Sequence, residues 1–532
     1  MDAKGGPMKL RYHLCAAAGI LILLWGASGA PAQDAKPAST ALALSLKDCL
    51  TKALAENLDL SIEAYNPALD DASISASKEQ FLPQFSLGYS NQNQTMLGGW
   101  GVEGTSYPYK YDSYSLNLTQ KVVTGGSATL SFNNSATNTG RAFQVINPSY
   151  NSIFQLNLIQ PLLKGFGPRV NRLATLQAVN QKDISVATLK ARLIQTVYDV
   201  EDAYWSLYSA LENVDVQTSA LDQSRAILKR NEEGARIGAK SSIDVLNSQT
   251  EVAQYEDGLV AARLAVDQAE ARLKKILNLP SDSPLSARSI RPSDKPAVEK
   301  KSISFDDALK AALEQRPEMV QSQKALENNA DLISYNKNQL LPDLNLTFNL
   351  WSPGQSGVKY IYDNGNAFTG TIVGQITGSR MDALRQALKM TYKNWSVNLS
   401  LSVPLASIFS RANLTKVKLA QDQIKLQMEK QKQTIVYEVT GAIQNLQNAE
   451  RKIVSSTAAR ELQEKRLAAE MQKFQLGLGS IEWLLSYQRQ LVTARMTEIR
   501  AQIDYKLAVA ALERVMGTSL KGKGLKFREY EF

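Results

Sequence analysis

The sequence predicts an α+β membrane protein in which barrel strands continue into long coiled-coil helices, with this plan present twice in tandem. Three observations predict it. Two strand openings match each other, the strand segments alternate apolar and polar residues, and the heptad-spaced helices are too long for a compact domain. The chain has 532 residues, a formal charge of +9 and 44% hydrophobic residues. That length suits several ordinary domains or one elongated one.

The first 32 residues have the features of a secretory signal peptide. Lys9 and Arg11 precede an apolar run from Leu14 to Trp25, and Ala30-Pro31-Ala32 has the small-x-small pattern of signal peptidase. The alternative is a membrane-anchoring helix, but this run is shorter than the roughly 20 residues that a spanning helix needs. We therefore expect cleavage of residues 1–32 and a mature chain that begins near Gln33.

The composition argues against several classes of function. His13 and Cys15 lie in the signal segment, so the mature chain has no histidine and a single cysteine, Cys49. It therefore lacks the residues for a Cys/His metal site or a Ser-His-Asp triad, and it has no nucleotide-binding glycine motif. Lysines and arginines alternate with acids instead of forming blocks. We expect no cofactor, no metal and no nucleic-acid partner, and a protein that is not an enzyme.

The duplication is visible in several motifs. Gln80–Tyr89 reads QFLPQFSLGY and Gln339–Phe348 reads QLLPDLNLTF, each after a polar helical segment. Ser45–Leu50 similarly matches Ser304–Leu309, where a serine starts a helix with acids in its first turn. These matches predict a first repeat at 33–279, a linker rich in Pro and Ser at 280–303, a second repeat at 304–520 and a tail at 521–532.

The strand segments span about 81–160 in the first repeat and about 340–405 in the second. Apolar residues fall on alternate positions and the residues between them are Ser, Asn, Gln and Thr, with few charges. Such period-two patterning is expected of a half-buried sheet or of a membrane barrel with lipid outside and water inside. Examples are Phe85, Leu87 and Tyr89, then Phe154, Leu156 and Leu158, then Val397, Leu399 and Leu401.

The helical segments favour the barrel over a soluble sheet. Their apolar positions alternate three and four apart, which is the heptad spacing of coiled coils. The segment from Asn171 to Arg236 contains no proline, so at about 1.5 Å per residue it would extend roughly 100 Å. The heptads include Leu189, Leu193, Val197, Val200, Tyr204 and Leu207, then Tyr255, Leu259, Ala262, Val266 and Ala269, then Ile435, Val439, Ala442 and Leu446.

The ordered set of motifs resembles the TolC-like outer-membrane efflux proteins, over nearly the whole mature chain. The residues that carry the resemblance are Phe81–Pro83, Leu340–Pro342, Gln160–Leu163, Val403–Ala406 and Gly238-x-x-Ser241-x-x-Asp244-Val245-Leu246. The family has two strands in each half, whereas the first half of this chain reads as four. Extra barrel strands and an extended outer hairpin both fit that pattern.

The resemblance implies a homotrimer that shares one barrel in the lipid of a Gram-negative outer membrane, continued by a helical tube in the periplasm. Its function would be that of a passive exit duct for an efflux or type I secretion system, fed by an inner-membrane transporter through a periplasmic adaptor protein. Two rivals are a secreted or surface coiled-coil adhesin and a periplasmic carboxylate hydrolase. The charge-free strands argue against the first, and the absence of a paired acid motif argues against the second.

The resemblance also implies a gate at the helix turns. Arg236, Gly238, Ser241 and Asp244 fit the first turn, and Gly477, Ser480 and Glu482 lie at the second. Trp483 occupies the position where the family pattern places an acid. We hypothesise that Asp244, with Glu482, forms an anionic ring that favours cations at the entrance. The alternative is that Asp244 caps the following helix.

Overall fold

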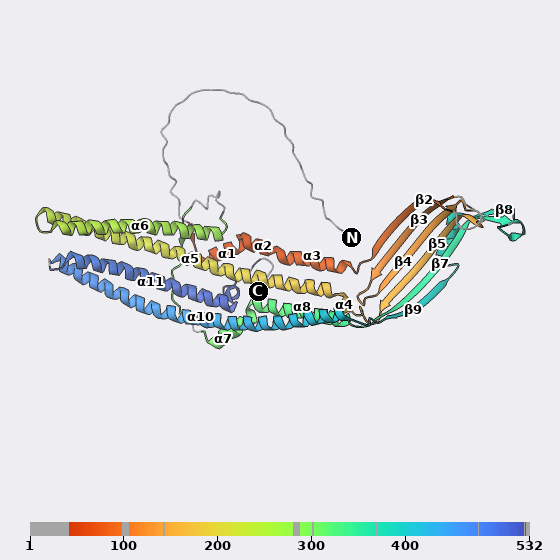
Figure 1. Ribbon diagram of the computed structural model, residues 1–532. Coiled ribbons are helices and arrows are strands. Elements are labelled where there is room, and N and C mark those ends of the chain that lie inside the picture. Colours follow the sequence, from red (N-terminus) through yellow and green to blue (C-terminus); the bar gives the residue numbers. More distant parts are fainter. Residues whose placement is uncertain are drawn as a thin grey trace, which may run out of the picture. The chain divides into compact units, whose positions relative to one another are not determined.

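The computed structural model describes residues 42–97, 106–141, 144–279, 288–299, 303–368, 370–476, 478–525 and 527. The predicted signal peptide, Gly477 and part of the predicted linker lie outside these ranges. Within the compact unit Ala41–Phe532, a β-sheet lies at one end of a bundle of long helices (Figure 1). No described helix is both long enough and apolar enough to span a bilayer.

Each half of the chain contributes short helices, then strands, then a pair of very long helices. In the first half these are α1 (Leu46–Glu56), α2 (Leu58–Glu63), α3 (Tyr65–Glu79), α4 (Pro168–Asn171), α5 (Leu173–Arg236) and α6 (Ser242–Ile276). In the second half they are α7 (Phe305–Gln315), α8 (Pro317–Asn338), α9 (Arg380–Leu388), α10 (Ile408–Gln475), α11 (Ile481–Met516) and α12 (Ser519–Gly522).

The helix starts have the same local chemistry in both halves. Ser45 caps α1 and Ser304 caps α7, and each serine hydroxyl accepts a hydrogen bond from the backbone N–H of an aspartate three residues later, Asp48 or Asp307. This pairing satisfies an N–H group that a helix start otherwise leaves without a partner. The predicted helix starts at these two serines are therefore confirmed.

The heptad positions form the core of the helical bundle, as the spacing predicts. Leu189, Leu193, Val200 and Tyr204 of α5 are completely buried, as are Ile435 and Val439 of α10. The 64 residues of α5 form one continuous helix about 96 Å long at 1.5 Å per residue. Tyr204 also fixes the segment between the halves, because its hydroxyl accepts a 3.1 Å hydrogen bond from the Asp294 N–H.

Part of the predicted linker is ordered against the first helices. Ile290–Pro292 forms strand β6, which pairs in parallel with β1 (Leu42–Leu44) at the start of the first repeat. At the other end, Lys523 lies within the predicted tail and makes an ion pair with Glu513 at 2.7 Å, while Phe527 is buried in the core cluster around α5. Both segments thus pack onto the helical body.

The main sheet is antiparallel and contains seven strands among the described residues. They are β2 (Gln84–Met96), β3 (Tyr107–Lys121), β4 (Ser127–Thr139), β5 (Ile146–Pro161), β7 (Asp343–Tyr362), β8 (Ile372–Thr377) and β9 (Asn394–Ser402). The spatial order is β2-β3-β4-β5-β7-β9, and the short β8 pairs with the distal end of β7. The two halves of the chain meet where β5 pairs with β7.

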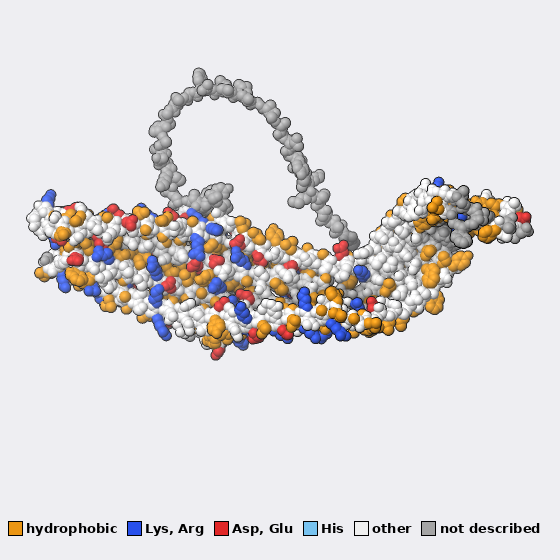
Figure 2. Space-filling view, in the orientation of Figure 1, with side chains coloured by type: hydrophobic (Ala, Val, Ile, Leu, Met, Phe, Trp, Pro, Cys, Tyr) orange, Lys and Arg blue, Asp and Glu red, His pale blue; other side chains and the backbone are white. Residues whose placement is uncertain are grey.

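The sheet has one apolar and one polar face, as the alternation predicts. Directly paired residues share a face. One row across all six long strands is Phe85, Leu118, Leu130, Leu156, Leu350 and Trp395, and the adjacent row on the other face is Gln84, Thr119, Thr129, Asn157, Asn349 and Ser396. Figure 2 shows that charged side chains concentrate on the helical part of the molecule.

The four strands of the first half all belong to the ladder. β3 pairs with β2 over Tyr107–Thr119 and with β4 over Tyr109–Lys121, so neither β3 nor β4 projects beyond the sheet as a separate hairpin. All four strands of the first half therefore belong to one sheet.

Cys49 provides a probe of the packing between α1 and α5. Burial is the main cause that raises the pKa of its thiol to about 12, with Asp48 and Asp294 contributing. Relative to the ordinary value of 9.0, this lowers the thiolate fraction at pH 8 about 1,000-fold. We expect a thiol reagent to leave the folded mature protein unlabelled and to react rapidly after denaturation. A Cys49→Ala variant is the blank, and fast labelling of the folded protein would contradict the packing.

Candidate functional site

The turns between the long helices lie at the end of the molecule away from the sheet (Figure 1). In the first turn, α5 ends at Arg236, which is exposed, and Gly238 follows with φ +76°. The Ala239 N–H then donates to the Gly234 carbonyl at 2.8 Å, which closes the helix end. This left-handed backbone favours glycine at position 238 because a side chain would be strained there.

Asp244 has a defined local role in this turn. Its Oδ2 accepts from the Ser241 N–H at 3.1 Å and from the Ser241 hydroxyl at 2.9 Å, and the Ser241 hydroxyl accepts from the Asp244 N–H at 3.2 Å. These contacts form a capping box at the start of α6. The capping role, which was the alternative to the anionic ring, is therefore present in the structure.

The second turn has a different construction. A Cβ on Gly479 would lie 2.8 Å from the backbone nitrogen of Phe474, so only glycine fits this close approach. Ser480 caps α11 by accepting a 3.2 Å hydrogen bond from the Glu482 N–H, and the Glu482 side chain is exposed. The predicted glycine of this turn, Gly477, lies outside the described residues.

The two turns contact each other. The ammonium group of Lys240, in the first turn, lies 4.5 Å from the centre of the Phe474 ring at the end of α10. Phe474 also belongs to a buried apolar cluster with Ile227 of α5 and with Leu484 and Leu485 of α11. The α5–α6 hairpin is therefore joined to the α10–α11 hairpin at the tip by an apolar cluster and by the Lys240–Phe474 contact.

Polar links between the hairpins lie just behind the tip. The Arg489 guanidinium of α11 forms an ion pair with the Glu251 carboxylate of α6 at 2.5 Å, and the Glu251 side chain is only 3% exposed. The Gln488 amide, also on α11, donates to the Ala220 carbonyl and the Ser224 hydroxyl of α5, each at 3.0 Å. We call Glu251, Arg489, Gln488 and Ser224 the polar layer.

The polar layer is incompletely satisfied. Among the described residues, Gln488 Oε1 is a buried acceptor atom without a hydrogen-bond partner, and the Tyr255 hydroxyl lies beside the Glu251 carboxylate. Burial raises the pKa of Tyr255, and the neighbouring Glu251 raises it further. Because a buried polar group without a partner is unfavourable, this layer is less stable than the apolar core around it.

Sequence reasoning found the turns but missed the polar layer. Gln488 is buried, whereas Gln249, which occupies the matching position of the first repeat, is exposed. A usable signal was present, because Ser224 interrupts the apolar spacing between Leu221 and Ile227. A polar residue at a heptad core position must find a partner on a neighbouring helix.

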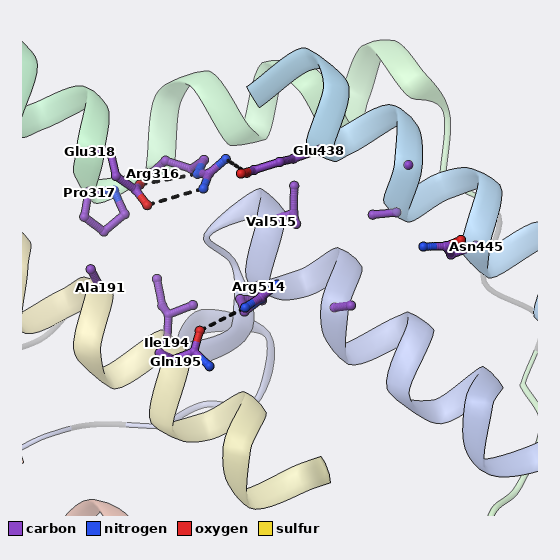
Figure 3. Close-up of a pocket in the computed structure, with 13 residues that line it drawn as sticks. Ala191, Ile194, Gln195, Arg316, Pro317, Glu318, Glu438, Asn445, Arg514 and Val515 are labelled. Carbon is purple, nitrogen blue, oxygen red and sulfur yellow. Dashed lines mark hydrogen bonds and ion pairs between the residues drawn. The ribbon is translucent and has the colours of Figure 1, made fainter. Parts of the chain in front are cut away.

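A second candidate location is a cavity of about 380 Å³ between α5, α8, α10 and α11 (Figure 3). Arg316 bridges its wall through ion pairs with Glu438 at 2.5 Å and Glu318 at 3.3 Å, and Arg514 donates to the Gln195 side chain at 2.9 Å. These groups are paired with one another across the joint between the two repeats. The described residues contain no group of three or more His, Cys, Asp or Glu that could hold a metal ion.

Comparisons with solved structures identify the fold. The chain is 17% identical to the outer-membrane channel OprN, covering 89% of this chain and 90% of that one with a TM-score of 0.64. It is 15% identical to the CmeC channel of Campylobacter jejuni, covering 91% of this chain and 87% of that one with a TM-score of 0.63. It is 13% identical to the outer-membrane protein VceC of Vibrio cholerae, covering 89% of this chain and 96% of that one with a TM-score of 0.61. These likenesses show that the fold is that of TolC-like channels.

A search of curated proteins finds no match to the sequence. The model of a protein family described as outer membrane efflux protein matches residues 126–279 and 308–518, one segment in each predicted repeat. These two segments include the long helix pairs and the candidate gate turns of both halves. The chain belongs to the outer membrane efflux protein family of Gram-negative outer-membrane channels.

Proposed function

We propose that three copies of this chain form a passive exit duct that receives substrate from an inner-membrane transporter through a periplasmic adaptor protein. The observation that carries the proposal is the uninterrupted polar row across six strands, backed by an apolar row on the opposite face. A sheet with these two faces suits a water-filled barrel in lipid. The long helices continue from the same sheet and suit a conduit across the periplasm.

Association of copies is supported by what one chain leaves exposed. Large apolar side chains on the long helices remain open to solvent, including Leu264 of α6 at 57%, Leu426 of α10 at 72% and Val454 of α10 at 69%. Such residues on heptad-type helices are best buried against a neighbouring copy. A secreted adhesin is disfavoured, because it would leave the apolar face of the sheet in water.

The need for an energised partner follows from the absence of a nucleotide-binding motif in the sequence. The duct itself supplies a pore and a gate, and the transporter supplies the work. The helix turns and the polar layer lie at the end of the tube that would meet the adaptor. We therefore assign the gate to the two turns together with the polar layer.

Planar-bilayer recordings of the detergent-extracted protein test the duct, with the mass of the protein measured by light scattering after correction for detergent. We expect a trimer that gives discrete conductance steps, because the polar rows then line a continuous aqueous path. A monomer that stays soluble without detergent and gives no conductance would overturn the proposal.

Replacement of Arg489 tests the gate. Arg489→Ala leaves the Glu251 carboxylate buried without its counter-ion, which costs about 1–3 kcal/mol, towards the lower end because Arg489 is half exposed. The ratio of open to closed channels should rise about tenfold, since 1.4 kcal/mol is one power of ten. Single-channel open probability measures it.

Two further variants complete the gate experiment. Arg225→Ala is the matched control, because Arg225 pairs with Glu256 across α5 and α6 with both side chains about half exposed, and such pairs contribute little. Glu251→Gln combined with Arg489→Ala removes the uncompensated charge and should restore part of the closed population. An Arg489→Ala channel that gates like the unmodified protein would exclude the polar layer from the gate.

The anionic ring requires a separate comparison. We expect Asp244→Asn combined with Glu482→Gln to reduce the preference of the channel for cations over anions. The reason is that the double variant removes two carboxylates from each copy, and so six from the entrance of a trimer. Ser241→Ala is the control, since it weakens the α6 cap by about 1 kcal/mol and keeps both charges. Reversal potentials in a salt gradient report the preference. An unchanged preference in the double variant would leave Asp244 with its capping role alone.

A further inference from the structure

We propose that the β3–β4 hairpin is a full part of the barrel wall, and that the barrel closes where β2 of one copy pairs with β9 of the next. Each copy then contributes six long strands, and three copies give a barrel of eighteen. This inference rests on the proposed trimeric duct and adds the number of strands, the partner surface and the width of the pore.

The helices enter the sheet at only four of these six strands. α3 leads into β2, α8 leads into β7, β5 continues into α4 and α5, and β9 continues into α10. β3 and β4 instead connect directly to each other through a tight turn at Val122–Gly126, on the helix side of the sheet. The hairpin thus widens the sheet without adding a helix to the tube.

The turn of this hairpin is built into the base of the sheet. Gly125 has φ +97°, and a Cβ there would come within 2.2 Å of the Gly165 carbonyl oxygen. The Thr124 carbonyl accepts from the Gly167 N–H at 3.0 Å, and the Thr124 hydroxyl lies 2.9 Å from the Gln160 side-chain oxygen. These contacts tie the turn to the segment that joins β5 to α5, as expected of a wall strand and not of a mobile hairpin.

The side chains of the hairpin match those of the flanking strands. Leu118 and Leu130 continue the apolar row, while Thr119 and Thr129 continue the polar row without a break. A hairpin folded into the lumen would place these leucines in water. The pattern therefore agrees with a position between lipid and pore.

The edges of the sheet identify the partner surface. Within the described residues, β2 and β9 each pair with another strand on one side only. The part of β7 that extends past its pairing with β9 is covered by α9 of the same chain, where the Gln355 N–H donates to the Gln386 side chain at 3.1 Å. An open edge is not tolerated in lipid, because its N–H and C=O groups lack partners. β2 runs away from the helices and β9 towards them, so the two edges meet antiparallel and continue the pattern of the sheet.

A single chain lacks the strands to close a barrel alone, because outer-membrane barrels start at eight strands. The partner that fits is a second copy of this chain. Barrel diameter grows roughly linearly with strand number. Six strands per copy would make the barrel about 1.5 times wider than one built only from the four helix-linked strands, and its cross-section about twice as large.

Electron cryomicroscopy of the purified full-length protein in lipid nanodiscs tests the strand number without any substitution. We expect six strands per copy in a closed ring, with β2 and β9 of neighbouring copies at the seam. A trimeric channel whose ring holds four strands per copy, with β3 and β4 outside it, would overturn this inference and leave the duct intact. Particles without a ring, together with absent conductance, would overturn both.

Cysteine pairs test the seam independently in a Cys49→Ala background. One cysteine replaces Gln84, Ser86 or Ser90 on the polar face of β2, and the other replaces Ser396, Asn398 or Ser400 on the same face of β9. We expect at least one of the nine pairs to give disulfide-linked multimers on denaturing gels. Asn117→Cys on β3 is the control partner for the β9 cysteines, because an interior strand lies beyond the roughly 7 Å that a disulfide spans. Linkage through Asn117, or none from any β2 pair, would refute the seam.

Discussion

Within a bilayer, every backbone N–H and C=O group of a spanning segment must find its partner inside the protein, and the sheet end of this molecule is organised around that constraint. Six long strands pair in a continuous antiparallel ladder. Above the end of β9, helix α9 packs closely against β7, and a Cβ on Gly354 would lie 2.0 Å from the Ala383 carbonyl oxygen. Among the described residues, the chain thus covers its own strands except at the β2 and β9 edges, which we propose to pair with other copies.

The helical body is held together differently. Each helix pairs its own backbone groups, and the helices are joined by side-chain packing. Its apolar core is continuous along α5 around Leu193 and Tyr204, where those side chains are fully buried. Towards the tips the continuous core is replaced by smaller apolar clusters, such as that of Ile227 with Phe474 and Leu484, and by the polar layer with its Glu251–Arg489 pair. Regions with few apolar contacts and incompletely paired polar groups open at lower free energy than the rest of a structure. The gate that we propose for this end of the molecule would use that property.

Much of the fold is predictable from the sequence, because it depends on periodicity. Alternation located the strands, heptads located the buried faces of α5 and α10, and Ser45 and Ser304 marked helix starts. The place of β3 and β4 was not predictable, since strand order depends on pairing between distant segments. The same holds for the site. The turns follow from local glycine and serine chemistry, whereas the Gln488–Ser224 and Glu251–Arg489 contacts depend on how two separate hairpins align.

The pairing of β5 with β7 also bears on the order in which the molecule assembles. The α5–α6 and α10–α11 hairpins each join helices that are adjacent in sequence across a short turn, and contacts of this kind form rapidly. The β5–β7 ladder joins the two halves of the chain, so it has to wait until the second half has been synthesised and exported. The helical hairpins are therefore expected to exist before the sheet is complete. Insertion into the membrane would then be the late step, in which preformed rods bring together strands that could not find their partners earlier.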